Sequence, residues 1–302
     1  MKSKRIAIIG SGISGLTCAW LLNKEFGDLA EVTLFERNDY FGGHTDTHEL
    51  TVDGQTLAVD TGFIVFNHHN YPRFTNMLDE LGVQSRDSDM SFSVSNRTTS
   101  FEYHFRGAAS LIKNLGLFAD QRFRQLFIDL LRFYKLNRDK PLDQIRTQMT
   151  LEDYVAHANL SKAFAQEHLY PMAGALWSMS AAEVKDIPLL FALGFFSNHK
   201  MLQLAGRPQW LTVQGGSNQY IKSLKARLKI HWKQEAVQSV KTQASGTGQQ
   251  VVTTQGEYAF DRVIFACHGD QALSLLSDAS AEEQEILSCF EYSDNTMYLH
   301  HD

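Results

Sequence analysis

Near the N-terminus, the stretch Ile6-Ala7-Ile8-Ile9-Gly10-Ser11-Gly12-Ile13-Ser14-Gly15 joins a short apolar run to a complete GxGxxG pattern. Four consecutive apolar residues predict a strand that is buried on both faces. Apolar residues then recur at helical spacing between Ser14 and Phe26, and Glu31 to Phe35 has the composition of a second strand. The order strand, helix, strand predicts the opening of a parallel sheet with a crossover helix.

The glycine pattern is typical of a dinucleotide site. Gly10 permits the tight turn, Gly12 lets the backbone approach a pyrophosphate, and Gly15 lets the helix pack closely on the strand. The helix N-terminus, at Ile13 and Ser14, supplies unpaired N–H groups and a partial positive charge to the phosphates. A glycine-rich turn without a ligand is the alternative interpretation.

Glu36 ends the second predicted strand, where its carboxylate can accept hydrogen bonds from ribose hydroxyls. The neighbouring Arg37 could favour a 2′-phosphate, but Glu36 would repel that phosphate, so NADP is disfavoured. A second glycine pair, Gly42-Gly43, follows before His44 and Thr45. It predicts another close approach of backbone to the phosphate and ribityl side of a cofactor, which a nicotinamide-binding sheet does not need.

The segment from Ile6 to His44 resembles the flavin-containing amine oxidase and phytoene desaturase superfamily. The resemblance implies FAD as a non-covalent cofactor. In that superfamily the glycine pair is usually followed by an arginine that approaches the cofactor phosphates, whereas this sequence has His44. His44 is therefore expected to bind the phosphates more weakly, or Arg37 or Arg73 is expected to supply the charge.

The resemblance continues in the superfamily's order and spacing. It implies that Gly62 lies on a strand entering the flavin site, that the Val237 backbone faces the adenine, and that Ala266 lies where the last parallel strand reaches the cofactor. It covers residues 5–82 and 210–275 well, and the helical middle of the chain only in character.

The predicted fold is α/β, with a Rossmann-type FAD-binding parallel sheet domain interrupted by an inserted, mostly helical lobe. Residues 1–82 and 206–302 form the two parts of the FAD-binding domain, and residues 83–205 form a substrate or cap lobe that includes a hairpin. Superfamily members close the flavin site with a further C-terminal segment, and this chain stops at Asp302 without one. We therefore expect an incomplete protein, and no catalytic residue is assigned.

The predicted lobe holds two stretches rich in large apolar side chains, Pro171 to Met179 and Leu189 to Phe196. Packing in a helical core is favoured for most of these positions. A channel for a long apolar substrate is the functional alternative, and the stretch from Asp60 to Asn67 resembles a bacterial branch of the superfamily associated with fatty-acyl modification. We expect a fatty-acyl chain to reach the flavin past Phe63, Trp177, Phe191 and Phe195.

The predicted activity is therefore that of a FAD-dependent oxidoreductase, a desaturase or oxidase that removes two hydrogens from an apolar substrate. An amine oxidase that acts on a C–N bond is the first alternative. A nucleotide-binding protein without turnover is the alternative of another class.

The composition argues against several other classes of protein. The 302 residues carry 28 Lys and Arg against 34 Asp and Glu, a net charge of −6, so nucleic-acid binding is not expected. Three scattered cysteines and dispersed histidines predict no metal site and favour a reducing, cytoplasmic setting. The sequence has no apolar stretch of the roughly 20 residues that would span a bilayer, while peripheral membrane contact stays open.

Overall fold

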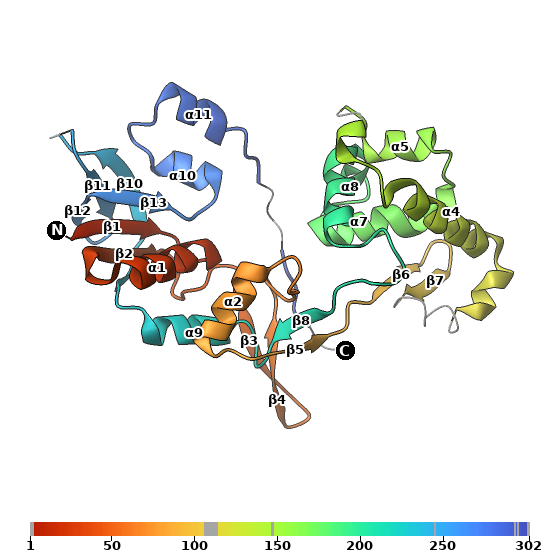
Figure 1. The fold of residues 1–302 in the computed structure, drawn as a ribbon, viewed down its shortest axis with the longest axis horizontal. Helices are drawn as coiled ribbons and strands as arrows, with labels where there is room; N and C mark the ends of the chain where they lie inside the picture. The colour runs from red at the N-terminus through yellow and green to blue at the C-terminus, as the bar shows by residue number, and fades with distance from the viewer. Residues whose placement is uncertain are drawn as a thin grey trace. The chain divides into compact units, whose positions relative to one another are not determined.

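The structure is a computed structural model that describes residues 3–105, 114–145, 148–244, 246–292, 294 and 296–300. The chain divides into two compact units (Figure 1). The first, called the sheet unit below, comprises Met1–Val65, Arg73–Arg86 and Thr212–Asp302; the second, the helical unit, comprises Phe66–Pro72 and Asp87–Leu211. The sequence predicted boundaries after residues 82 and 205. In the structure the corresponding boundaries lie after Arg86 and Leu211, and residues 66–72 also belong to the helical unit.

A four-stranded parallel sheet forms the centre of the sheet unit. Its strands, in spatial order, are β13 (Arg262–Phe265), β1 (Lys4–Ile9), β2 (Ala30–Glu36) and β9 (His231–Gln234). Ile8 pairs with Leu34 on one side and with Ile264 on the other, and its side chain is fully buried. The prediction of an α/β fold with a parallel sheet is confirmed, although β9 was not predicted.

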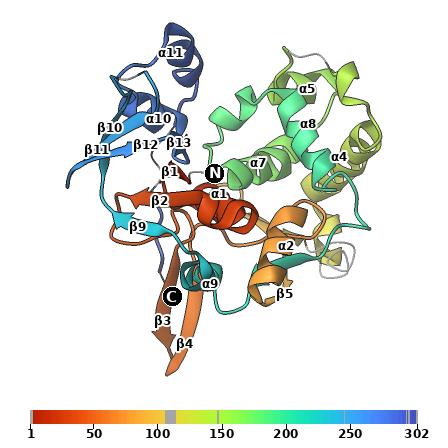
Figure 2. The same ribbon diagram turned by 60° about the vertical axis from the view of Figure 1, so that its left-hand side comes forward.

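Helix α1 (Ile13–Phe26) connects β1 to β2 and lies alongside both strands in the two views (Figures 1 and 2). Leu16 and Ala19, on one face of this helix, are fully buried. This crossover therefore holds the glycine pattern at the carboxyl end of β1, where ligands bind in open parallel sheets.

The hairpin predicted at Val52 to Gln55 is confirmed, with β3 (Thr47–Val52) pairing antiparallel with β4 (Gln55–Asp60). Asp53 and Gly54 in its turn both have positive φ, as a two-residue hairpin of this type requires. The sheet unit also contains helices α2 (Pro72–Leu81), α9 (Asn218–Arg227), α10 (Gly269–Leu275) and α11 (Ala281–Leu287), a 3-10 turn η1 (Gly27–Leu29), and the antiparallel strands β10 (Val237–Thr242), β11 (Gln249–Thr253) and β12 (Glu257–Phe260). Strands β5 (Ser85–Ser88) and β8 (Trp210–Val213) pair where the chain passes between the units.

The helical unit is built on an aromatic core. Its hairpin consists of β6 (Phe92–Asn96) and β7 (Phe101–Phe105), close to the pair predicted from sequence. Its helices are α4 (Gln121–Asn137), α5 (Leu151–His157), α6 (Lys162–Phe164), α7 (Tyr170–Trp177) and α8 (Leu189–Asn198), with short 3-10 turns η2 (Leu115–Ala119), η3 (Leu142–Gln144) and η5 (Glu183–Asp186) and a π-helical turn η4 (Ala165–Leu169). Phe133, Phe164 and Phe196 are almost completely buried in the largest cluster of this core.

Candidate cofactor site

Gly10 and Gly15 are required by the packing of the loop itself. A Cβ on Gly10, whose φ is 105°, would lie 2.5 Å from the Ala266 carbonyl oxygen, and a Cβ on Gly15 would lie 2.0 Å from the Gly10 carbonyl oxygen. Ala266 donates its N–H to the Ile9 carbonyl at 2.8 Å, so the ends of β13 and β1 meet at this loop. A side chain at Gly10 would therefore push the loop away from the end of β13, and one at Gly15 would push the helix away from the turn at Gly10.

Gly12 is different, because nothing in the protein requires a glycine there. It has φ −64° and ψ 178°, a conformation open to any residue, and a Cβ built on it would meet no atom within 4 Å. Gly12 is also the N-cap of α1, where no side chain caps the first N–H groups, and Ile13 and Ser14 in the first turn are exposed. This open space beside unpaired helix N–H groups fits a pyrophosphate.

Glu36 is buried and held in one orientation by neighbours from two segments. Ser11 donates to its Oε2 through the backbone N–H at 3.0 Å and through Oγ at 2.5 Å, while the Asn38 N–H donates to Oε1 at 3.0 Å. A carboxylate has about four acceptor positions, so Oε1 keeps room for a ribose hydroxyl. Ser11 was missed by the sequence prediction because it occupies a variable position of the GxGxxG pattern.

The second glycine pair lies against the first glycine loop. A Cβ on Gly43 would lie 2.9 Å from the Gly12 Cα, and the Gly42 N–H donates to Ser11 Oγ at 3.0 Å. The pair thus adjoins the open space at Gly12, as a second approach to cofactor phosphates would need. Thr45 follows and is buried, with its hydroxyl hydrogen-bonded to that of Tyr220, whose pKa burial raises to about 12.

His44 and Gly62 are neighbours. The Phe63 N–H donates to the His44 carbonyl at 3.1 Å, and a Cβ on Gly62 would lie 2.0 Å from that oxygen. The exposed His44 ring lies 5.9 Å from the ring of His268, which stacks on Tyr292 at 4.2 Å. The predicted residues from both glycine loops and from Gly62 therefore come together in the sheet unit.

Arg37 and Val237 flank the same region. Burial raises the pKa of the Cys267 thiol, next to Ala266, and the charge of the nearby Arg37 opposes that rise. Val237 packs on the buried cluster that contains Phe35, the residue before Glu36. Both residues thus lie beside the carboxyl ends of β1, β2 and β13.

The predicted substrate residues fall in two units. In the helical unit, the Trp177 ring lies 5.3 Å from the rings of both Phe191 and Phe195, and Phe191 is 55% exposed. Phe63 belongs to the sheet unit and packs against Phe74 at 5.2 Å. The structure brings together the three aromatic residues of the helical unit and leaves the fourth in the sheet unit.

Within the described ranges, no group of three or more His, Cys, Asp or Glu side chains could hold a metal ion. Also within those ranges, no helix combines the length and apolar character needed to cross a membrane.

The fold and the glycine loops define a nucleotide-binding α/β protein. Residues 13–291 match the sequence family described as flavin containing amine oxidoreductase, and the chain belongs to that family. Membership confirms the predicted resemblance to the flavin-containing amine oxidase superfamily, and it agrees with FAD as the cofactor. The open space at Gly12 and the buried carboxylate of Glu36 fit the pyrophosphate and the ribose of FAD.

The individual relatives share limited sequence identity with this chain, and each is longer than it. The chain is 26% identical over 226 residues to 4,4′-diapolycopen-4-al dehydrogenase of Metabacillus indicus, a match that covers 65% of this chain and 43% of the relative. Among solved structures, a fatty acid isomerase from P. acnes has a TM-score of 0.62 at 15% identity, with 95% of this chain and 64% of that chain covered. Cyclohexylamine oxidase from Brevibacterium oxydans has a TM-score of 0.67 at 16% identity, with 95% and 63% covered. The chain therefore spans between two fifths and two thirds of these proteins.

Proposed function

We propose that the sheet unit is a discontinuous Rossmann-type domain that binds FAD without a covalent bond. The observation that carries this proposal is the open space at Gly12, bordered by Gly43 and placed beside the buried Glu36. The N–H groups of Ile13 and Ser14 bind the pyrophosphate, and Glu36 Oε1 accepts a ribose hydroxyl. Gly42, Gly43, His44 and Thr45 line the phosphate and ribityl side, with Gly62, Val237 and Ala266 at the positions that the superfamily resemblance implies.

FAD held by these residues would supply a hydride acceptor, its isoalloxazine ring. The protein's own contribution is to orient the cofactor and to keep water away from it. Ser11 and Asn38 fix the Glu36 carboxylate before any ligand arrives, so little ordering remains to be done on binding.

The helical unit is proposed to be the substrate lobe, and its substrate an apolar molecule with a fatty-acyl chain. Trp177, Phe191 and Phe195 offer a partly exposed aromatic surface for such a chain. The fold shared with a fatty acid isomerase is consistent with this substrate class. Each CH₂ group that the chain buries would contribute up to about 0.8 kcal/mol.

An amine substrate is the second candidate. The TM-score is 0.67 for cyclohexylamine oxidase against 0.62 for the fatty acid isomerase, and the aromatic rings around Trp177 could surround an amine. Nucleotide binding without turnover is the third candidate.

The test has two stages. The purified chain is first titrated with FAD, and bound flavin is followed by its absorbance and fluorescence. The loaded protein is then mixed anaerobically with fatty acids of increasing chain length and, separately, with cyclohexylamine. Reduction that quickens with chain length supports the acyl substrate. Rapid reduction by cyclohexylamine, together with a rate of reduction by fatty acids that does not depend on chain length, would favour the amine oxidase. Bound flavin that neither kind of compound reduces would favour nucleotide binding without turnover.

A further inference from the structure

Helix α4 presents an exposed face of unusual composition. At 100° per residue, a sector of about 140° holds the uncharged Gln121 and Gln125 and six charged or aliphatic residues: Arg124, Ile128, Leu131, Arg132, Lys135 and Leu136. We call these six residues the α4 outer face. Its three aliphatic side chains are 58%, 40% and 44% exposed, while the opposite side of the helix carries the buried Phe123, Leu126, Leu130 and Phe133.

The α4 outer face has cations but no acid. The one acidic residue in α4, Asp129, is only 2% exposed and accepts hydrogen bonds from the Ser161 N–H and from Gln125. It therefore faces the interior of the helical unit. Three cations and three exposed aliphatic side chains on one face contrast with a chain whose net charge is −6.

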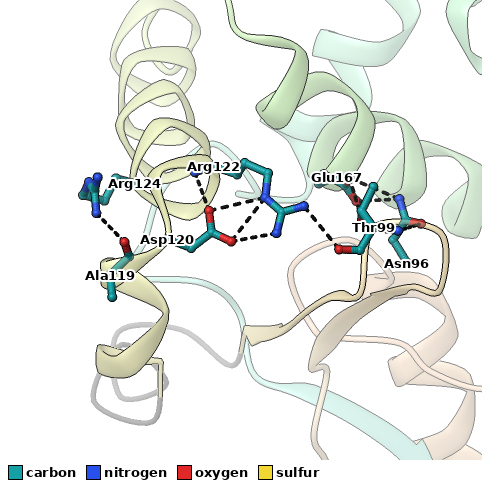
Figure 3. Close-up of polar contacts among 7 residues, drawn as sticks. All are labelled: Asn96, Thr99, Ala119, Asp120, Arg122, Arg124 and Glu167. Atoms are coloured by element: carbon teal, nitrogen blue, oxygen red, sulfur yellow. Dashed lines mark hydrogen bonds and ion pairs between the residues drawn. The ribbon is translucent and has the colours of Figure 1, made fainter.

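Among the residues that the structure describes, no carboxylate forms an ion pair with Arg124, Arg132 or Lys135, although the charge of Arg124 does act on Asp120. Figure 3 shows the contrast at the start of the helix, where Arg122 pairs with Asp120 at 2.8 Å, whereas Arg124 donates to a backbone carbonyl, that of Ala119, at 2.8 Å. Arg132 donates to the Asn159 carbonyl at 3.1 Å. Lys135 has no carboxylate partner among the residues that the structure describes.

The positive charge continues into a hollow at the C-terminal end of α4. The hollow has a volume of about 640 Å³, and Arg132, Lys135 and Lys140 line it. Its one lining acid, Asp139, pairs with Arg138 at 3.2 Å. The ends of α4 and α5 each add about half a negative charge there, which three cations exceed.

We propose that the α4 outer face docks on an anionic phospholipid surface. Interfacial helices combine exposed aliphatic side chains with Lys and Arg in this way, because the aliphatic groups enter the acyl boundary while the cations bind lipid phosphates. A phosphate backbone of nucleic acid would match the cations but would leave Ile128, Leu131 and Leu136 in contact with charge. Docking would bring the helical unit to the place where molecules with long acyl chains reside.

Vesicle co-sedimentation of the full 302-residue chain tests this proposal. Vesicles of phosphatidylcholine alone are compared with vesicles that also contain about one third phosphatidylglycerol, at low and at high salt. Binding is expected only to the anionic vesicles, and 0.5 M salt should reduce it strongly. Equal binding to both kinds of vesicle, or binding to neither, would overturn the proposal.

Matched variants locate the surface. Arg132→Gln with Lys135→Gln should lower partitioning about 25-fold, since each cation near an anionic surface is worth about fivefold. Ile128→Ser with Leu131→Ser should weaken binding even at low salt.

The control is Lys222→Gln with Lys229→Gln, which removes the same charge from exposed positions of the sheet unit and should bind as the unchanged protein does. An equal loss in the control would show a net-charge effect and count against the α4 outer face. FAD affinity, measured on the same proteins, should not change, so failure of docking and failure of flavin binding are separate results.

Discussion

At the scale of single residues, the three glycines of the GxGxxG pattern serve two different physical purposes. Gly10 and Gly15 have backbone atoms at 2.5 Å and 2.0 Å from where a Cβ would lie, whereas Gly12 has open space. The sequence pattern predicts all three glycines but cannot distinguish these purposes. The three-dimensional contacts separate them, since Gly10 packs on the Ala266 carbonyl and Gly15 on the Gly10 carbonyl, whereas Gly12 has no such neighbour.

Ser11 connects the parts of the candidate site. Ser11→Ala removes the hydroxyl that donates to Glu36 and accepts from Gly42, and it leaves that buried N–H unpaired. We expect FAD affinity to fall about tenfold or more, as for a buried hydrogen bond worth 1–3 kcal/mol. Ser14→Ala, at an exposed position that retains its N–H, is the control for fluorescence titration. Equal affinities for Ser11→Ala and Ser14→Ala would contradict the role of Ser11.

His168 makes the helical unit sensitive to acid. Burial, together with the charge of nearby Arg207, lowers its pKa to about 4. The Tyr103 hydroxyl is hydrogen-bonded to its Nδ1 at 2.6 Å, and burial raises the pKa of Tyr103, so the phenol stays protonated beside the neutral imidazole. The unfolded chain, with a histidine pKa near 6.5, takes up the proton first, so stability is complete above pH 6.5 and falls as the pH approaches 4.

The free energy of unfolding is expected to fall by roughly 3 kcal/mol over this pH range, because each unit of pKa shift corresponds to about 1.4 kcal/mol. Denaturant unfolding of the protein between pH 7 and pH 4 measures it. In His168→Gln, which keeps an acceptor for Tyr103 but does not titrate, the slope over this interval should be much smaller. An unchanged slope would assign the acid sensitivity to other groups.

At the scale of elements, local signals predicted the helices and strands that carry strong patterns. β1 is a continuous apolar run, and the Asp-Gly turn of the β3–β4 hairpin has the required positive φ angles. β9 was missed because His231-Trp232-Lys233-Gln234 is a polar edge strand, exposed at both ends, with neither an apolar run nor alternation. Its place beside β2 depends on tertiary pairing that a local pattern does not contain.

The capping box that begins α5 offers an element-level test. Thr150 accepts from the Asp153 N–H at 3.1 Å, and Asp153 accepts from the Thr150 N–H at 3.0 Å. Thr150→Ala should cost about 1 kcal/mol in the free energy of unfolding, whereas Thr150→Ser keeps the hydroxyl and should cost much less. Denaturant titrations that found both variants equally destabilised would argue against the cap.

At the scale of the whole molecule, the candidate site is assembled from segments distant in sequence. The two glycine loops and Glu36 come from the first 45 residues, and Val237 and Ala266 come from the last quarter of the chain. The motifs predicted the first group directly, and only the superfamily resemblance suggested the second. The aromatic residues near Trp177 were predicted to line a substrate channel, and that role stays a prediction.

Flavin binding by Gly12→Val is the most direct test of the proposed site. A Cβ at this position would enter the open space with no protein atom within 4 Å, so the variant should still fold, with a small loss of stability from the poorer N-cap, and should bind no FAD. Gly15→Val is the contrast, because its side chain would strike the Gly10 carbonyl and should destabilise the fold itself. Equilibrium titration with FAD, alongside thermal unfolding without it, is the measurement. A folded Gly12→Val protein with undiminished flavin affinity would contradict the placement of the pyrophosphate at this loop.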